Sequence, residues 1–137
     1  MQTPRVEIDL NKIRLNSEYL VKKLKPNGIQ VVGVTKAVCG HPKIASAIIA
    51  GGVIGLADAR IENVIRMRRA GINSDITMIR TPMASQIELI LDNCNTSYNT
   101  EMSIIEKLAN AAQKKNRTHN IILMVEMGDL REGILPK

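Results

Sequence analysis

A short aliphatic run followed by a helical pattern recurs along the chain, and this repeat constrains the fold more than any other feature. From residue 31 onward such runs begin near residues 31, 53, 76, 96 and 121, about one every 20 to 25 residues. Regular alternation of strand and helix predicts a parallel sheet, because parallel strands need a crossover that is usually a helix. The sequence therefore predicts an α/β fold. Doubly wound sheets and (β/α)8 barrels share this pattern, so both architectures remain open at this point.

Local signals place the individual elements. Strands are predicted at 5–10, 29–35, 53–57, 75–80, 96–99 and 120–126, and helices from about 11 to 25 and at 42–50, 61–71, 83–93 and 100–116. Asp9 or Asn11 suits the cap of the first helix, and Thr100 or Ser103 suits the start of the last one. Several strands are apolar on both faces, as expected of parallel strands that are covered on one side and packed inside on the other.

The chain shows no linker, low-complexity segment or second domain, so residues 1–137 are predicted to form a single domain. A complete (β/α)8 barrel typically needs about 250 residues. Five strands after a leading strand account for about half of one, and the chain stops at "REGILPK", directly after a strand. We therefore expect a partial barrel domain that is truncated at its C-terminus.

Composition narrows the class of protein. The chain lacks Phe and Trp and has only two tyrosines, so the core must be aliphatic and a base-stacking surface is hard to build. The net charge is +6, but the basic residues are scattered, and the short basic runs at 21–25, 66–69 and 114–117 each lie late in a predicted helix, where cations complement the helix dipole. No apolar run is long enough for a membrane span, and the N-terminus does not resemble a signal peptide. The cysteines, Cys39 and Cys94, lack metal-ligand spacing and suit reduced thiols in the cytoplasm. We expect no nucleic-acid, membrane or metal partner.

Polar residues follow the predicted strands, at the edge of a parallel sheet where ligands bind. This edge is predicted to carry Lys36, Asp58, Arg60, Arg80, Asn99, Glu126, Asp129 and Arg131. Lys36, in "VVGVTKAVCGH" (31–41), follows a run that reads as a buried strand. A lysine amine attacks a carbonyl only when it is neutral, and burial together with Arg80 and Arg131 nearby would favour that form. The alternative is a lysine that extends into water from a strand end.

Four segments in order resemble one known family. "VVGVTKAVCG" (31–40), "LADARIENVIRMRRAG" (56–71), "MIRTPM" (78–83) and "VEMGDLREGILP" (125–136) are similar to segments of the alanine/ornithine racemase family. The resemblance covers essentially the whole chain. It implies a parallel (β/α) barrel of the alanine racemase N-terminal type, of which about the first half to two-thirds is present, and the cofactor pyridoxal 5'-phosphate.

The resemblance also implies roles for individual residues. Lys36 matches the lysine that forms the Schiff base with the cofactor and acts as one of two acid/base groups. Arg131 matches the arginine that contacts the cofactor's phenolic oxygen, and Asn99 lies at a strand end under the cofactor ring. Arg80 and Asp129 are predicted to contact substrate, although the position that matches Asp129 in alanine racemases is not acidic. For Asp129 two interpretations remain open: the acid pairs with a distal ammonium group of the substrate, or it pairs with Arg131 or caps the loop and does not meet substrate.

The sequence departs from the family pattern in two ways. Alanine racemases carry a phosphate-side tyrosine shortly after the lysine, whereas this chain has Cys39, Gly40 and His41, so backbone N–H groups near Pro42 are expected to help hold the phosphate. The later barrel strands and the domain that supplies the second base are also absent from the sequence. The isolated chain is therefore expected to be inactive.

The leading functional hypothesis is a cytoplasmic amino-acid racemase (an isomerase) that uses pyridoxal phosphate. The resemblance implies an amino-acid substrate and a homodimer of the full-length protein. A pyridoxal-phosphate lyase or aldolase of the same fold and a non-catalytic protein that binds the cofactor are the alternatives, and an α/β nucleic-acid binder ranks last. The sequence leaves the particular amino acid open.

Overall fold

The structure, a computed structural model, describes residues 3–135. Helices and strands alternate along the chain, with short 3-10 turns (η) between some of them. The elements are α1 (Leu10–Leu24), η1 (Lys25–Asn27), β1 (Val32–Val34), η2 (Lys36–Val38), α2 (Pro42–Ala50), β2 (Gly55–Asp58), α3 (Ile61–Arg69), β3 (Ile76–Met78), η3 (Ala84–Gln86), α4 (Ile87–Asn93), β4 (Thr96–Asn99), α5 (Met102–Lys114) and β5 (Asn120–Leu123).

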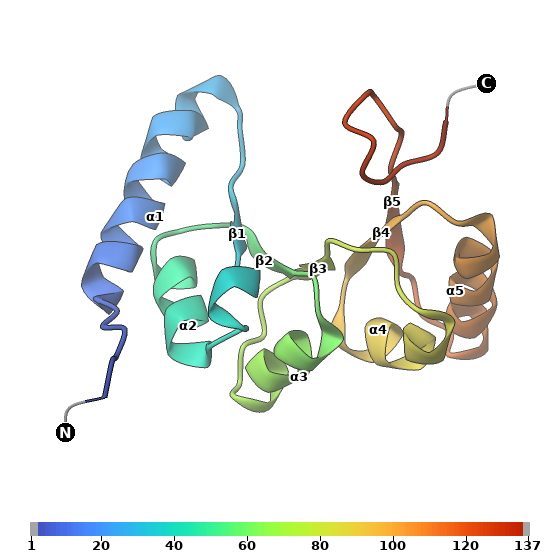
Figure 1. The fold of residues 1–137 in the computed structure, drawn as a ribbon, viewed down its shortest axis with the longest axis horizontal. Coiled ribbons are helices and arrows are strands. Elements are labelled where there is room, and N and C mark those ends of the chain that lie inside the picture. Colours follow the sequence, from blue (N-terminus) through green and yellow to red (C-terminus); the bar gives the residue numbers. More distant parts are fainter. Residues whose placement is uncertain (1–2, 136–137) are drawn as a thin grey trace.

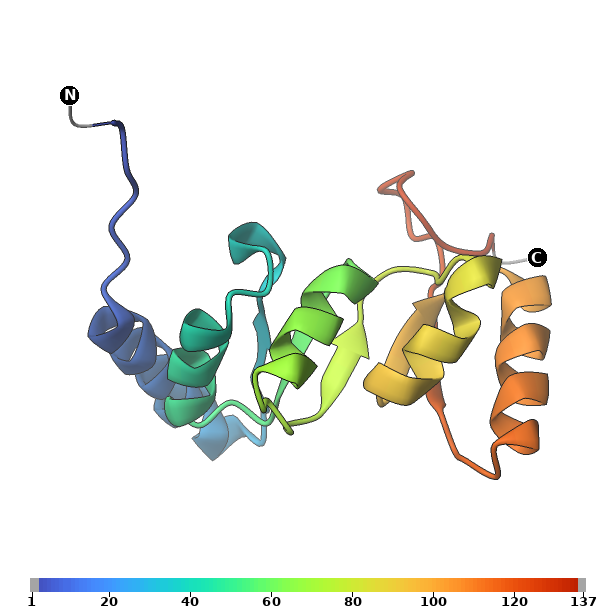
Figure 2. The same ribbon diagram turned by 90° about the horizontal axis from the view of Figure 1, so that it is seen from below.

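The strands form one parallel five-stranded sheet in the order β1-β2-β3-β4-β5. In Figure 1 they follow one another along an open arc, with the helices on its outer side. Figure 2 shows α2 to α5 side by side in chain order in front of the strands. A doubly wound sheet reverses its strand order at a switch point and carries helices on both faces, whereas a barrel does neither. The order therefore selects the barrel type and confirms the expected parallel α/β fold.

The core lies between the sheet and the outer helices. The strands contribute Leu56, Ile76 and Met78, and the helices contribute Val64, Met67, Ile90, Leu91 and Leu108. All of these side chains are buried. These core side chains are aliphatic apart from those of methionine. In a chain with so few aromatic residues, the flexible methionine side chains fill irregular gaps in the core.

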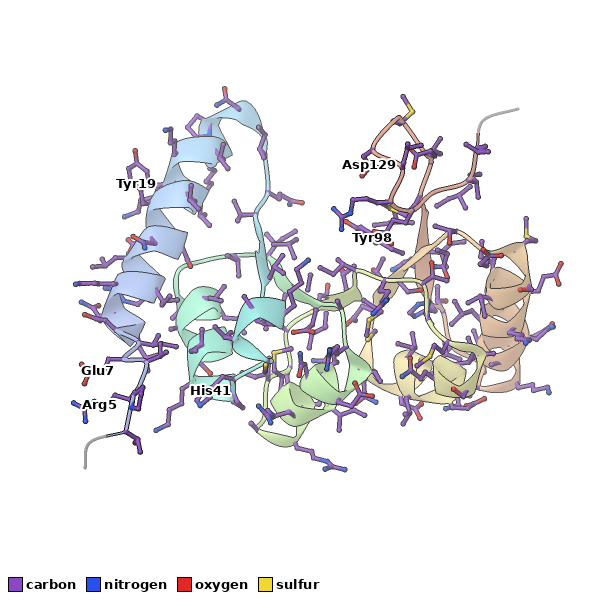
Figure 3. All side chains as sticks on the ribbon, in the orientation of Figure 1. Arg5, Glu7, Tyr19, His41, Tyr98 and Asp129 are labelled. Atoms are coloured by element: carbon purple, nitrogen blue, oxygen red, sulfur yellow. The ribbon has the colours of Figure 1, made fainter. Side chains whose placement is uncertain are left out.

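The predicted strand at 5–10 is wrong. Residues 3–9 lie outside any strand, Val6 is 88% exposed, and Arg5 and Glu7 form an ion pair with each other on this segment (Figure 3). Helix α1 begins at Leu10 because Asp9 caps it: one carboxylate oxygen accepts the backbone N–H groups of Asn11 and Lys12. An alternating pattern does not form a strand when no partner strand pairs with it.

Strand β1 is less buried than its sequence suggested. Val32 is 42% exposed and Val34 is 48% exposed. A Cβ atom at Gly33 would lie 2.3 Å from Ile48 Cγ2 of α2, so Gly33 faces the helices and the two valines face the inner, concave side of the arc. The prediction of a buried strand is therefore wrong for the inner face of β1, where both valines keep close to half of their surface exposed.

Candidate active site

The predicted site residues follow the carboxyl ends of the strands, an edge that we call the carboxyl rim. Lys36 comes two residues after β1, Asn99 ends β4, and Arg80 comes two residues after β3. Asp129 and Arg131 lie in the segment that follows β5. Because β1 and β5 are the two edge strands, Lys36 and Arg131 lie at opposite ends of the arc. The rim therefore collects these residues on one edge of the sheet.

Lys36 is the first residue of η2, in a turn made of residues 35–40 that we call the Lys36 turn. Its side chain is exposed, rather than desolvated as a buried strand end would have made it. Among residues 3–135 it takes part in no ion pair. The amine is therefore accessible from solvent and is not held by a carboxylate of these residues.

A buried polar cluster lies directly under the Lys36 turn. The Asp58 carboxylate, fully buried at the end of β2, accepts hydrogen bonds from the Thr35 hydroxyl at 2.7 Å, the Asn63 amide at 2.9 Å and the Arg60 backbone N–H at 3.0 Å. Asp58 and Arg60 were among the rim residues predicted from the sequence, but Thr35 and Asn63 were missed. Their polar side chains next to a lysine and in the first turn of a helix were the available signal.

The segment after β5 folds back on itself as a loop of residues 124–134, which we call the Arg131 loop. Ile134 donates a backbone hydrogen bond to Met124 and accepts one from Glu126, both at 2.9 Å. The Glu126 carboxylate accepts the N–H groups of Leu130 and Gly128, and these bonds lower the pKa of Glu126 below its ordinary value. Glu126 thus shapes the loop that presents Arg131.

Asp129 and Arg131 are both exposed on this loop. A carboxylate oxygen of Asp129 lies 3.4 Å from the backbone nitrogen of Arg131 and accepts a long hydrogen bond from it. The two side chains do not form an ion pair with each other.

Asn99 is fully buried at the end of β4. Its amide nitrogen donates to the carbonyl and the hydroxyl of Ser97, and that hydroxyl lies 2.9 Å from His119 Nε2. Burial lowers the pKa of His119. Within residues 3–135, Asn99 Oδ1 is buried without a hydrogen-bond partner, which leaves an acceptor open for a donor that is absent from the described residues.

Tyr98 was not singled out from the sequence. Ser97 pairs in register with Ile121, which lines a small cavity together with His119 and residues of α5, so Ser97 and Asn99 face the helices. Tyr98 alternates with them and faces the concave side, where Figure 3 shows it near β5 and away from α4. It supplies an aromatic surface on the inner face of the arc.

Arg80 lines a cavity of about 400 Å³ between the ends of β2 and β3. Arg60, Glu62, Thr81 and Gln86 contribute polar groups to the same cavity. The Thr81 hydroxyl lies 3.1 Å from the Thr100 hydroxyl and accepts the Thr100 backbone N–H, which joins the ends of β3 and β4. Two arginines, Arg60 and Arg80, thus line this cavity, and a guanidinium group suits a carboxylate.

The chemistry of these residues fits pyridoxal phosphate in part. Lys36 offers a free amine to the aldehyde, and Arg131 offers a cation to the phenolic oxygen. The N–H groups of Cys39, Gly40 and His41, however, already donate to carbonyl groups within the Lys36 turn. These three groups are therefore not available to the phosphate in this conformation.

In the part of the chain that the structure describes, no three His, Cys, Asp or Glu side chains gather where they could hold a metal ion. None of the described helices combines the length and the apolar character that a membrane crossing requires.

Comparison with known proteins identifies relatives over nearly the whole chain. The family model described as "Alanine racemase, N-terminal domain" matches residues 8–137. The chain is similar to the lysine racemase of Thermotoga maritima, at 33% identity over 98% of this chain and 38% of that protein. It is similar to the ornithine racemase of Acetoanaerobium sticklandii at 30% identity, over 95% of this chain and 36% of that protein. It thus spans little more than a third of the length of these relatives.

Solved structures share the fold. The alanine racemase from E. faecalis superposes with a TM-score of 0.83 at 24% identity, over 94% of this chain and 36% of that one. The D-threonine aldolase from Filomicrobium marinum superposes with a TM-score of 0.83 at 18% identity, over 99% of this chain and 38% of that one. The expected partial barrel of the alanine racemase type is therefore confirmed.

Proposed function

This chain belongs to the alanine racemase N-terminal domain family, and on that premise we propose that it is the part of a pyridoxal-phosphate-dependent amino-acid racemase that binds the cofactor covalently, through Lys36. The observation that carries the proposal is the Lys36 turn. It combines an exposed, unpaired amine at the carboxyl rim with a backbone that is held by buried hydrogen bonds. A reactive group on a fixed backbone is what covalent catalysis requires.

Each residue at the rim has a defined task in this proposal. Bound pyridoxal phosphate supplies an electron sink for the electron pair that remains when the substrate Cα loses its proton. Lys36 would hold the cofactor through its Nζ atom, and its amine would hold or move a proton at one face of the substrate Cα. Arg131 approaches from the opposite end of the arc and stabilises negative charge on the phenolic oxygen.

We further propose a substrate with a distal ammonium group. The lysine and ornithine racemases among the relatives motivate this choice. Asp129 is an exposed carboxylate without an ion-pair partner in residues 3–135, and it stands on the same loop as Arg131. Arg80 lies with Arg60 on the cavity wall between β2 and β3, where it suits the α-carboxylate.

Reductive trapping tests the covalent anchor. The full-length protein, loaded with pyridoxal phosphate and reduced with borohydride, should carry the pyridoxyl label on the peptide that contains Lys36. Lys36→Ala should abolish the label, while Lys43→Ala, which removes an exposed lysine on the neighbouring helix α2, should retain it. A label on another lysine would overturn the proposal.

Substrate assays then separate the reactions open to this fold. Loss of optical rotation of an L-amino acid without release of an aldehyde supports a racemase. Glycine and an aldehyde formed from a β-hydroxy amino acid would instead indicate an aldolase. A labelled Lys36 without turnover of any amino acid would indicate a protein that binds the cofactor but does not catalyse.

A further inference from the structure

We propose that Asp58 is a positioning residue for Lys36, and that its buried carboxylate fixes the Lys36 turn through the Thr35 hydroxyl and the Asn63 amide. This inference rests on the proposed function, in which Lys36 anchors the cofactor. It adds a residue that touches neither cofactor nor substrate in that proposal. Asp58 ends β2 at the rim, and its buried side chain faces helix α3.

The hydrogen bonds of Asp58 use both carboxylate oxygens. Oδ2 accepts from the Thr35 hydroxyl at 2.7 Å, while Oδ1 accepts from the Asn63 amide and the Arg60 backbone N–H. Three elements, namely the end of β1, the end of β2 and the first turn of α3, therefore meet on one side chain. A carboxylate with three donors is well satisfied for its polar contacts, and its position is fixed by them.

Thr35 transmits this constraint to the lysine. Its backbone N–H donates to Ala57 at 2.9 Å, and its carbonyl accepts the N–H groups of Val38 and Gly40, both at 3.1 Å. Thr35 is fully buried, whereas the next residue, Lys36, is exposed. The hydrogen bonds of Thr35 therefore fix the position of the backbone to which the Lys36 side chain is attached.

Asn63 holds the other end of the same turn. Gly40 is buried with a φ of +61°, and a Cβ atom there would lie 2.8 Å from both Asn63 Cβ and the Asn63 carbonyl oxygen. The Arg66 side chain also donates to the Cys39 carbonyl at 3.2 Å. Asp58 thus bonds to Thr35, at the start of the Lys36 turn, and to Asn63, against which Gly40 packs closely at the end of the turn.

Stability alone gives a poor reason for this arrangement. Among residues 3–135, Asp58 forms no ion pair, although it is fully buried. Burial of a carboxylate without a cation costs free energy that an apolar residue would not. The neighbouring residues Leu56 and Met78 are buried and apolar, so this face of the sheet accommodates apolar side chains. We infer that the buried carboxylate serves to fix the geometry of the backbone at Lys36.

The test removes the Thr35 hydroxyl and measures cofactor binding. In the full-length protein, Thr35→Val should raise the dissociation constant of pyridoxal phosphate about tenfold, followed by the absorbance of the bound cofactor, because a small misplacement of the amine is costly. Thr35→Ser restores the hydroxyl and should bind within about twofold of the parent protein. The control is Asn95→Ala, which removes hydrogen bonds to the Ile76 N–H and the Arg68 side chain at the amino ends of the strands.

The result that overturns the positioning role is a Thr35→Val protein that binds the cofactor as Asn95→Ala does, or a Thr35→Ser protein that fails to recover. Should Thr35→Val not fold, Asp58→Asn keeps the side-chain shape and replaces the charge-assisted bond by a weaker neutral one. Its dissociation constant should rise about threefold, and no rise would equally overturn the proposal. Borohydride trapping on Lys36→Ala separates the two proposals: a label retained there refutes the covalent anchor, whereas its loss with unchanged Thr35→Val binding refutes Asp58 alone.

Discussion

The two ends of the carboxyl rim are built differently. The Lys36 turn stands on fully buried side chains, Thr35 and Asp58, that tie it to β2 and α3. The Arg131 loop is largely exposed, and Met127 and Leu130 are its most exposed large apolar side chains. Leu135, which directly follows the loop, is also exposed. The Arg131 loop is held by its own backbone hydrogen bonds and by Glu126. One end is fixed by the core, and the other is fixed by a loop that closes on itself.

This difference separates the roles of the two regions. A residue that must meet a reactive carbon at a defined angle benefits from support in the core, where side chains have little freedom. A residue that stabilises charge at longer range tolerates an exposed loop, whose local opening costs less free energy than opening the core. We therefore expect damage to the Lys36 turn to reach the whole domain, and damage to the Arg131 loop to remain local.

Two glycines provide the largest test of this contrast. Gly40→Ala combines a positive φ with a Cβ atom 2.8 Å from Asn63, so we expect about 2–4 kcal/mol of lost stability. Gly133→Ala also has a positive φ, and its Cβ atom would collide with the backbone of Val125 and Glu126. Because that collision lies in the exposed loop, we expect less than about 1 kcal/mol in global unfolding.

Denaturant unfolding measures both variants, and amide hydrogen exchange locates the damage. Gly133→Ala should speed exchange at Glu126 and Ile134, whose N–H groups close the loop. Equal losses of global stability in the two variants would contradict the contrast between the two ends of the rim.

Asp129→Asn should produce the next largest effect, on activity alone. We expect kcat/KM of the full-length enzyme to fall at least tenfold for a dibasic amino acid and less than twofold for a neutral one, because only the dibasic substrate loses a charge-assisted bond. Asp75→Asn, which removes an exposed carboxylate before β3, is the control. Equal losses for both substrates would assign Asp129 to the shape of the loop.

A smaller effect is expected from His119, which supports β4 through Ser97. Burial lowers the pKa of His119 below its ordinary 6.5, so the neutral form is favoured in the folded state. Its stability contribution is present above pH 6.5 and is lost as pH falls through the lowered pKa. The measurement is the free energy of unfolding as a function of pH. In His119→Gln this free energy should fall less steeply below pH 6.5 than in the parent protein. An unchanged slope would mean that other groups cause it.

The smallest effect concerns Glu126. Backbone N–H groups of Leu130 and Gly128 lower its pKa below the ordinary 4.5, so its contribution is present above pH 4.5 and disappears as pH falls through the lowered value. In the parent protein, exchange at Leu130 should accelerate in that acidic range, after correction for intrinsic rates. Glu126→Gln should show faster exchange already at neutral pH and no acid step. Persistence of the step in this variant would assign it to another group.

Local signals in the sequence located several elements to the residue. Helix α2 runs from Pro42 to Ala50 and β4 from Thr96 to Asn99, as predicted, because proline and glycine punctuate both ends of α2 and the runs are short. The start of α5 was less well predicted, since Glu101 and not Thr100 or Ser103 stands at its N-cap position. The strand expected at 5–10 failed because pairing depends on a neighbour that an alternating pattern cannot reveal.

The sequence by itself determined the parallel βα repeat and placed Lys36, Arg80, Asn99, Asp129 and Arg131 after the strands, because the apolar period and the strand ends are local properties. Only the tertiary structure decided which side chains face the helices and which face the concave side. That choice exposes Val32 and Val34, buries Asn99 and presents Tyr98. It also brought Asp58 under the Lys36 turn, since a hydrogen bond between residues 35 and 58 depends on the register of two strands. Register is set by packing across the sheet, and packing joins residues that the sequence keeps apart.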